Sequence, residues 1–343
     1  MGDVFYATRE EVKSAMDSAE TARDNAKVDR AIAAASRAIE GQTLRKFYPL
    51  TATRTFDWPA PYSRSWRLWL DENELISVSA LSSGGTTIVA ADYFLRPDIG
   101  PPFTYVEVDL ASSASFGGGS THQRDVSITG VWGYSNDEAP AGALAEALDA
   151  SETAVDVTNS ALIGIGSVLR VDSERMLVTG KTMLTTGQTG TLTLNNAATT
   201  LAVTTGSAFA VDEMILLGSE RMLIEDIAGN NLIVKRAWDG SVLAAHTGAT
   251  IYARRTLTVE RGALGTAAAT HDSAAAIVKH VPPGPIRQLC IAEALNTIQQ
   301  ESSGYARQIG QGETAREAFA RGLKDLRAEV YASYGRMARL GTV

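Results

Sequence analysis

The side chains best suited to acid–base or metal chemistry recur at matched positions of a sequence repeat. Glu174 and Glu220 each stand between a serine and an arginine in near-identical segments, and His246 and His271 are equivalent in a second pair of segments. A carboxylate and an imidazole are common partners in general acid–base catalysis. Because each of these groups occurs twice, we interpret them as packing and anchoring groups of the repeated unit. A metal ion shared by the two histidines is the alternative, although the sequence nominates no carboxylate ligands for it.

Other motifs of enzyme chemistry are missing from the sequence. Glu174-Arg175 and Glu220-Arg221 are expected in turns and strands, where an exposed pair contributes about 0–1 kcal/mol. Cys290 is expected to be a buried packing thiol, because no base is nominated beside it. Gly164-Ile165-Gly166 lacks the third glycine of a dinucleotide fingerprint, and neither a phosphate loop nor a Gly-x-Ser-x-Gly elbow occurs. We therefore predict a non-enzymatic protein without a cofactor or a metal.

The composition is that of an ordinary folded protein. The chain has 343 residues, of which 45% are hydrophobic and 20% are charged, and this length favours about two domains. Its net charge of −8 argues against coating of nucleic acid, but it allows DNA to pass without adhering. No run of about 18 apolar residues occurs, so we expect no membrane-spanning segment.

Helical periodicity marks both ends of the chain. Near the N-terminus, Thr8 and Glu11 fit a capping box. The apolar stripe of a second helix follows, formed by Val28, Ile32, Ala35 and Ile39. After residue 281 the helical period returns, and a long amphipathic helix carries the stripe Phe319, Leu323, Leu326, Val330, Tyr334 and Met337. This last stripe must be buried, either within its own subunit or against a partner.

The period changes to two between residues 52 and 136, which predicts half-buried strands of a small antiparallel sheet. Within this region Arg64, Trp66, Arg67 and Trp69 interleave charge with aromatic rings, as nucleic-acid-binding proteins do. Strand alternation is the simpler explanation of that pattern. Residues 112–120 are rich in glycine and serine, which predicts a mobile loop of the kind that meets partners.

Two duplications lie between residues 137 and 281. Segment A, residues 157–178, returns 46 positions later as A′ at 203–224, and segment B, residues 232–246, returns 25 positions later as B′ at 257–271. All four segments are short, β-branched and punctuated by turns, which is typical of strands. If A pairs with B and A′ with B′, the two halves are interleaved. We therefore predict one compact β barrel or sandwich with approximate two-fold symmetry.

Three segments give the outer parts of the chain a recognisable order. They are Tyr6-Ala7-Thr8-Arg9-Glu10-Glu11-Val12 before an Ala-rich helix, Thr129-Gly130-Val131-Trp132-Gly133-Tyr134 at a strand end, and Val281-Pro282-Pro283 before another helix. This order resembles the head-to-tail connector, or adaptor, family of long-tailed bacteriophages. In that family the second and third segments lie a few residues apart, whereas here residues 135–280 separate them. The simplest interpretation is a β domain inserted into one surface loop.

The resemblance implies an α+β fold with two domains. The first is a helical-bundle adaptor frame with a small antiparallel sheet, formed by residues 1–136 and 282–343. The second is an all-β barrel or sandwich that interrupts this frame at residues 137–281 and contains the interleaved A-A′-B-B′ duplication.

The resemblance also implies a structural role in the virion neck, between capsid and tail, after assembly in the host cytoplasm. Adaptors form a ring of twelve copies under the portal protein, extend the channel for DNA ejection, and receive the next neck, stopper or tail protein. Genomic DNA passes through without sequence-specific binding. By this analogy the C-terminal stripe docks onto the portal, through Phe319, Leu323, Leu326, Val330, Tyr334 and Met337. The Gly/Ser loop meets the lumen or the downstream ring, through Phe116, Gly117, Gly118 and Gly119.

Two other functions are compatible with the sequence. One is another phage neck, tail or baseplate structural protein that uses the β domain for adhesion, and a location distal to the tail tube would favour it. The other is a carbohydrate-active enzyme, for which the sequence shows no pair of catalytic carboxylates at a characteristic spacing.

Overall fold

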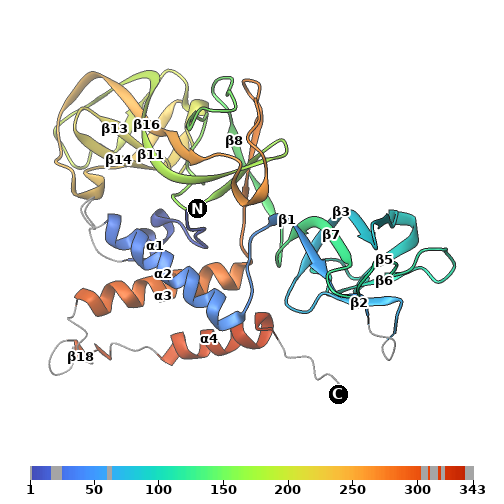
Figure 1. Cartoon of the computed structure of the whole chain (residues 1–343). Coiled ribbons are helices and arrows are strands. Elements are labelled where there is room, and N and C mark those ends of the chain that lie inside the picture. Colours follow the sequence, from blue (N-terminus) through green and yellow to red (C-terminus); the bar gives the residue numbers. More distant parts are fainter. Residues whose placement is uncertain are drawn as a thin grey trace. The chain divides into compact units, whose positions relative to one another are not determined.

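The chain folds into two compact units (Figure 1). The computed structural model describes residues 2–16, 25–59, 64–302, 308–309, 316–317 and 321–336. Unit 1 comprises Met1–Thr43, Glu138–Ala263 and Ala267–Val343, and unit 2 comprises Leu44–Asp137 and Leu264–Thr266. The terminal helices therefore share a unit with the β-rich region, whereas the division drawn from the sequence joins them to the small sheet.

The predicted helical-bundle frame is wrong, because the protein is mostly β. Strands account for 38% of the chain and helices for 23%, and the largest sheet has ten strands. The described residues form four α-helices: α1 (Arg9–Ala15), α2 (Asn25–Thr43), α3 (Gly284–Ser302) and α4 (Arg321–Tyr334). The residues with helical periodicity at the two ends of the chain do form helices, and these helices pack into one layer. Most apolar residues between Thr43 and Gly284 are instead buried by sheets.

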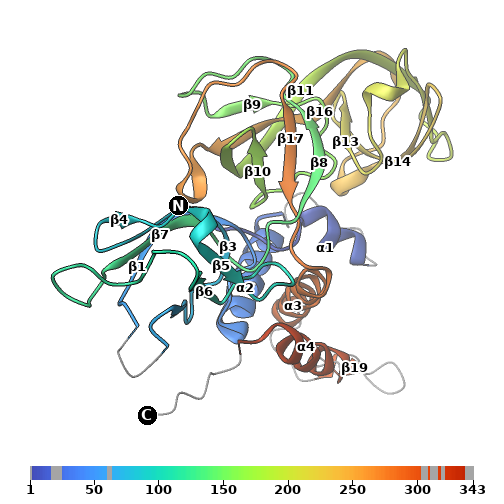
Figure 2. The same cartoon turned by 90° about the vertical axis from the view of Figure 1, so that its right-hand side faces the viewer.

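The helical layer joins the two ends of the chain (Figures 1 and 2). The predicted stripe of α2 is buried where α2 packs along α3, and α4 packs on α3 in turn. Within the pair of α2 and α3, Ser36 Oγ lies 3.5 Å from Cys290 Sγ, and burial raises the pKa of this thiol to about 11. Near the end of α3, Arg30 Nη2 lies 3.1 Å from Glu301 Oε2. Cys290 is thus the buried packing thiol that the sequence predicts.

The N-terminal segment ties the helical layer to the β-rich region of unit 1. The predicted capping box is confirmed, since the side chains of Thr8 and Glu11 each accept a hydrogen bond from the other's backbone N–H. The Phe5 N–H donates to the carbonyl of Gly166 at 3.0 Å. The Phe5 ring occupies the space that a Cβ at Gly166 would need, and the φ of +78° there also favours glycine.

Unit 2 contains two antiparallel sheets, with strand orders β1-β7-β3-β4 and β2-β6-β5. Its strands are β1 (Leu50–Phe56), β2 (Arg67–Trp69), β3 (Leu75–Ser83), β4 (Thr86–Thr87), β5 (Tyr93–Arg96), β6 (Tyr105–Val108) and β7 (Val126–Trp132). A 3-10 helix, η2 (Ala90–Asp92), precedes β5. The alternating residues of the sequence pattern meet in one core, around Leu75, Ile128 and Trp132. The Trp132 Nε1–H donates to Ala52 O at 2.9 Å, which satisfies its buried indole.

The ten-stranded sheet of unit 1 has the order β12-β15-β14-β13-β16-β11-β10-β17-β8, and β9 pairs with β16. Its strands are β8 (Glu138–Ala143), β9 (Ala154–Asp156), β10 (Val168–Val171), β11 (Glu174–Leu192), β12 (Thr200–Ala202), β13 (Met214–Leu217), β14 (Glu220–Ala228), β15 (Asn231–Lys235), β16 (His246–Glu260) and β17 (Ala276–His280). Three 3-10 helices lie in its loops: η3 (Gly206–Ala208), η4 (Trp238–Gly240) and η5 (Ala263–Gly265). A separate short pair is formed by β18 (Gln308–Ile309) and β19 (Arg316–Glu317).

The duplicated segments form two equivalent modules. Leu177 pairs with Glu260 across β11 and β16, and Leu223 pairs with Lys235 across β14 and β15. These pairs are related by the same offsets as the sequence repeats, 46 on one side and 25 on the other. Segment A therefore pairs with B′, and A′ pairs with B. The expected pairing of A with B is wrong, and the two modules are nested rather than interleaved.

We call residues 154–178 with 256–280 module I, and residues 200–255 module II. Each module has its own buried core: Val155, Leu169, Met176, Leu257 and Ile277 lie in the first, and Leu201, Ile215, Met222, Leu232 and Ile251 in the second. The single predicted barrel or sandwich core is therefore also wrong. Local pairing of A′ with B needs only the β14–β15 hairpin, whereas pairing A with B would require closing a longer loop.

The chain enters and leaves the duplicated region through neighbouring strands. In the antiparallel pair of β8 and β17, Glu138 is the direct partner of His280. The two covalent connections of the region between these residues thus lie side by side.

Candidate functional site

The same buried Glu-Arg-His cluster closes each module. In module I, Arg261 donates from Nε and Nη2 to the two oxygens of Glu174, at 2.7 and 2.8 Å. His271 Nε2 lies 2.8 Å from Glu174 Oε2, and the backbone N–H groups of Gly262 and Ala269 also donate to this carboxylate. Glu174 is fully buried, so this carboxylate is satisfied within the protein.

Each hydrogen-bonding group around Glu174 has an equivalent around Glu220 in module II. Arg236 donates to both oxygens of Glu220 at 2.8 and 2.7 Å, His246 Nε2 lies 2.9 Å from Oε2, and the backbone N–H groups of Ala237 and Ala244 donate to it. Both carboxylates and the Arg236 side chain are fully buried. The expectation that these glutamates are anchoring groups fits this geometry. The expectation of exposed pairs between each glutamate and its neighbouring arginine is wrong. The glutamates are buried, and their partners are Arg236, which follows β15, and Arg261, which follows β16.

One polar side chain of the module I cluster has no counterpart in module II, because Asp172 corresponds to Gly218. Asp172 Oδ2 lies 2.8 Å from His271 Nδ1, whereas a Cβ at Gly218 would come within 3.6 Å of the His246 ring. Both residues have a positive φ, of +51° and +55°, so the turn is the same in both modules. The two histidines belong to separate clusters and do not share a site. Among the described residues, no group of three His, Cys, Asp or Glu side chains is arranged to hold a metal ion.

The clustered carboxylates titrate far below their ordinary range. Burial alone would raise the pKa, but hydrogen bonds from the arginine, the histidine and two backbone N–H groups outweigh it and lower the pKa of Glu174 and Glu220 from 4.5 to about 2. A carboxyl group whose folded-state pKa is lowered stabilises the fold above its unfolded pKa, and this contribution is lost as the pH falls towards the folded pKa.

Acid should therefore destabilise both modules. We expect each cluster to lose roughly 3 kcal/mol between about pH 4.5 and about pH 2, because one pKa unit corresponds to about 1.4 kcal/mol. Urea unfolding followed at about pH 6 and about pH 3 measures about 2 kcal/mol of this loss for each cluster, since the rest is lost only below pH 3. The Glu220→Gln variant, which lacks one of the titrating groups, should show a weaker pH dependence. An equal dependence in both proteins would contradict this assignment.

A buried ion pair connects module II to the helical layer. Lys13 Nζ on α1 lies 2.6 Å from Asp239 Oδ1 on η4, and both side chains are almost fully buried. Arg254 Nη2 lies 3.6 Å from the other oxygen of Asp239, and Arg9 on α1 is paired with Asp29 on α2. Asp239 has a φ of +55°, which a short polar side chain tolerates better than most. No sequence pattern predicts a pairing between Lys13 and Asp239, which lie far apart in the chain.

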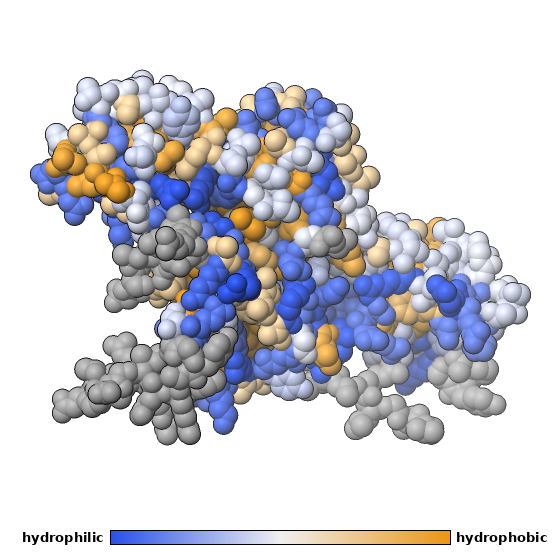
Figure 3. Space-filling model, turned by 60° about the vertical axis from the view of Figure 1, so that its left-hand side comes forward, coloured by the Kyte–Doolittle hydropathy of each residue, from blue (hydrophilic) through white to orange (hydrophobic). Residues whose placement is uncertain are grey.

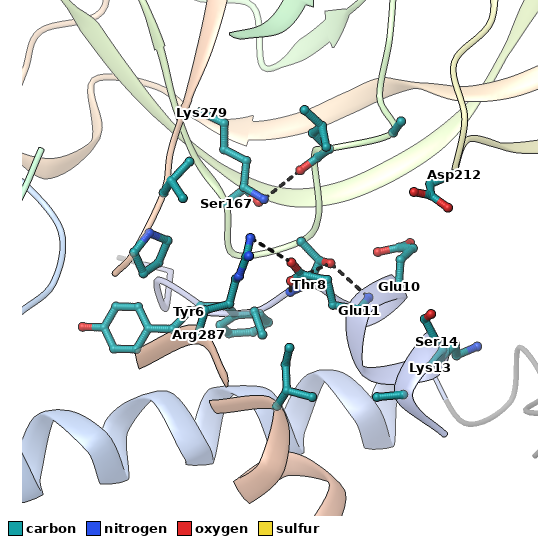
Figure 4. A pocket seen from close by; sticks show the side chains of 18 of the residues that line it. Tyr6, Thr8, Glu10, Glu11, Lys13, Ser14, Ser167, Asp212, Lys279 and Arg287 are labelled. Atoms are coloured by element: carbon teal, nitrogen blue, oxygen red, sulfur yellow. Dashed lines mark hydrogen bonds and ion pairs between the residues drawn. The ribbon is translucent and has the colours of Figure 1, made fainter. Parts of the chain in front are cut away.

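Beside this ion pair lies a cavity of about 930 Å³ between the N-terminal segment and the two modules (Figure 4). Its charged lining is mixed, with Glu10, Glu11, Asp212 and Glu225 against Lys13, Lys235, Lys279 and Arg287. Lys279 Nζ donates to Leu162 O at 2.8 Å, and burial lowers the pKa of this lysine. Arg287 Nη1 lies 3.4 Å from Glu11 Oε1. The lining carries charges of both signs, and Arg287 and Glu11 are paired with each other, so its charge favours neither an anionic nor a cationic ligand.

The predicted portal-docking stripe lies on α4, in part. Leu323 and Val330 are buried and Leu326 and Tyr334 are half-buried, while Phe319 and Met337 lie outside the described residues. Arg327 Nη2 lies 2.6 Å from Glu293 Oε2, which fixes α4 to α3. The buried part of the stripe therefore packs within the chain itself. Tyr331, which the stripe does not include, is 45% exposed.

The predicted contact loop of unit 2 is tied to its sheet. Phe116 packs against the core of the unit, and the Gly117 N–H donates to Ser83 Oγ at 2.8 Å. A Cβ at Gly117 would lie 3.2 Å from the Trp58 ring, and one at Gly119 would clash with the Asp125 carboxylate. Gly118 is exposed and has free space around its Cα. The role of this loop at a lumen or a downstream ring stays a prediction.

The outer surface of unit 1 mixes polar and apolar patches on the side that Figure 3 presents. Exposed large apolar side chains of its β region are Leu162, Leu194, Val211, Val242 and Tyr252. Within the part of the chain that the structure describes, no helix is long and apolar enough to cross a membrane. Comparison of the chain with known protein families, with curated proteins and with solved structures gave no match.

Proposed function

We propose that this protein is a structural adaptor of a phage neck, which forms a ring under the portal and joins the capsid to the tail. The observation that carries the proposal is the helical layer, in which α2 from the N-terminal part packs on α3 and α4 from the C-terminal part. The resemblance implies that helices from the two ends of the chain belong together, and their packing supports the proposal on this point alone.

The attachment of the β region supports the same proposal. Because Glu138 and His280 are direct partners, the duplicated modules can be accommodated as an insertion at one surface turn. The buried Glu-Arg-His clusters then serve as scaffold for the modules, since their polar atoms are bonded to one another. In this proposal the acidic chain lines a channel through which DNA passes without adhering.

Portal binding through α4 is the first property to test. We expect Tyr331→Asp to weaken binding to the purified portal at least about tenfold, because a buried charge replaces an exposed aromatic anchor in the contact. The matched control is Tyr252→Asp on β16, since Tyr252 is 38% exposed and lies outside the helical layer. Equilibrium binding to immobilised portal measures both variants. If Tyr331→Asp and the wild type bound the portal with equal affinity, α4 would not be part of the contact.

A further inference from the structure

The ion pair between α1 and η4 is held almost out of reach of water. Lys13 Nζ lies 2.6 Å from Asp239 Oδ1, and each of the two side chains is only 4% exposed. The cost of taking two charges out of water can exceed the energy of their mutual attraction. An amide bond between the two side chains would remove both charges and would leave neither group without a partner.

This pair differs from the other buried ion pairs in the chemistry of its cation. The other buried carboxylates of the described residues are Glu74, Glu174, Glu213 and Glu220, and each is paired with an arginine. A guanidinium stays protonated in proteins, so it does not act as a nucleophile. The lysine ammonium becomes a nucleophilic amine once it gives up a proton, and its partner Asp239 is placed to accept that proton.

The two oxygens of the Asp239 carboxylate face different cations. Oδ1 faces Lys13, whereas Arg254 Nη2 lies 3.6 Å from Oδ2. If the amine attacks the carboxyl carbon, Oδ1 is the oxygen beside the protons that the nitrogen loses. Negative charge then develops on Oδ2, where the guanidinium of Arg254 stabilises it. The geometry therefore assigns one oxygen to the leaving water and the other to the new carbonyl group.

Both reacting groups are held in place by local structure. The lysine lies on α1, whose first turn is fixed by the capping box. On η4, the Ala237 N–H donates to the buried Glu220 Oε1 at 3.1 Å, and the Ser241 N–H donates to Trp238 O at 3.1 Å. These bonds fix the turn that presents Asp239. Reacting groups that are held in contact behave as if they were present at a very high concentration.

The cavity next to the pair gives the released water a way out. Lys13 lies on its lining, together with Trp238, the residue before Asp239 (Figure 4). Because charged side chains line this cavity, a water molecule that enters it finds hydrogen-bonding partners.

We propose that Lys13 and Asp239 condense to an intramolecular isopeptide bond, which links α1 covalently to module II. The ammonium transfers one proton to Oδ1, and the lone pair of Nζ then attacks Cγ. A second proton passes from Nζ to the same oxygen, the Cγ–Oδ1 bond breaks, and water leaves. The product is a neutral amide with one proton on Nζ and Oδ2 as its carbonyl oxygen. The reaction consumes no further reactant, and the inference does not depend on the adaptor function.

Mass spectrometry of the denatured full-length chain tests this bond. We expect the chain to be lighter than its sequence by one water molecule. Trypsin does not cleave after an acylated lysine, so the digest should contain a branched peptide that joins residues 10–23 to residues 237–254. The matched control is Lys13→Arg, which keeps the positive charge but has no amine to acylate. This variant should show neither the loss of water nor the branched peptide.

The wild-type digest decides the question even if the variant does not fold. A wild-type chain of full mass, with trypsin cleavage after Lys13, would overturn the proposal. Asp239-Gly240 could lose the same water by closing a succinimide ring within its own backbone. Loss of water that persists in Lys13→Arg, without the branched peptide in the wild type, would assign the loss to that ring and would overturn the isopeptide bond.

Discussion

Replacing Arg236 with methionine should destabilise module II by about 3–5 kcal/mol, which is the usual cost of removing one partner of a buried ion pair. Without this guanidinium, the fully buried Glu220 keeps only His246 and two backbone donors. The carbonyl oxygens of Thr193 and Ala244 also lose their donor. Because module II has its own core, the strands β13, β14 and β15 should lose protection while module I keeps it.

Hydrogen–deuterium exchange measured by mass spectrometry resolves this difference between the modules. The matched control is Arg30→Met, which removes a mostly exposed arginine from its surface pair with Glu301 and should cost at most about 1 kcal/mol. The equivalent change in module I, Arg261→Met, should act on β10 and β17 instead. Uniform loss of protection over both modules in Arg236→Met would show that they form one cooperative core.

Removing module II entirely should leave module I folded. Thr182 and Thr256 are direct partners in β11 and β16, so residues 183–255 can be replaced by an Asn-Gly turn that closes a hairpin. The cluster of Glu174, Arg261 and His271 lies outside the removed segment. Lys13 loses Asp239, but it also becomes accessible to water and needs no buried partner.

Hydrogen–deuterium exchange measured by mass spectrometry tests the shortened chain, in which we expect β10 and β17 of module I to keep their protection. Its control is Arg261→Met in the shortened chain, which should remove that protection because the buried Glu174 loses its arginine partner. If A paired with B and A′ with B′, the same deletion would remove half of each pair and leave no folded module. An unfolded shortened chain would therefore contradict the nested arrangement.

The sequence predicts local features of this fold well. The capping box of Thr8 and Glu11, the buried stripe of α2 and the thiol of Cys290 depend on neighbours within a few residues or on one helix face. The offsets of 46 and 25 also mark the duplicated strands correctly. Such features are local or repetitive, so their pattern is visible without knowledge of the tertiary fold.

Pairing and burial were not predictable in the same way. The order A-A′-B-B′ is compatible with both interleaved and nested pairing, and nothing in either segment selects the partner. Glu174 looks like a surface residue until Arg261 and His271, far along the chain, are brought to it. A usable signal was present: glutamate, arginine and histidine all recur together in both copies. Three polar positions that recur together indicate that their side chains form one cluster in each copy, and not three separate surface groups.

The candidate contact surfaces were predictable from the sequence only in part. The stripe on α4 shows which residues are apolar, but the spacing alone does not tell whether α3 or a partner covers them. The structure places Leu323 and Val330 in the subunit and leaves Tyr331 exposed. Likewise, alternation predicts that Arg67 and Trp69 share a face, but the joining of β5 and β6 to that face depends on the sheet order.

Electron microscopy of the purified chain mixed with a purified portal tests the proposed adaptor function most directly. We expect an annulus of twelve copies on the tail-facing side of the portal, with the β modules as separate lobes on each copy. Density for the chain at the distal end of the tail, or a chain that never joins the portal, would contradict it.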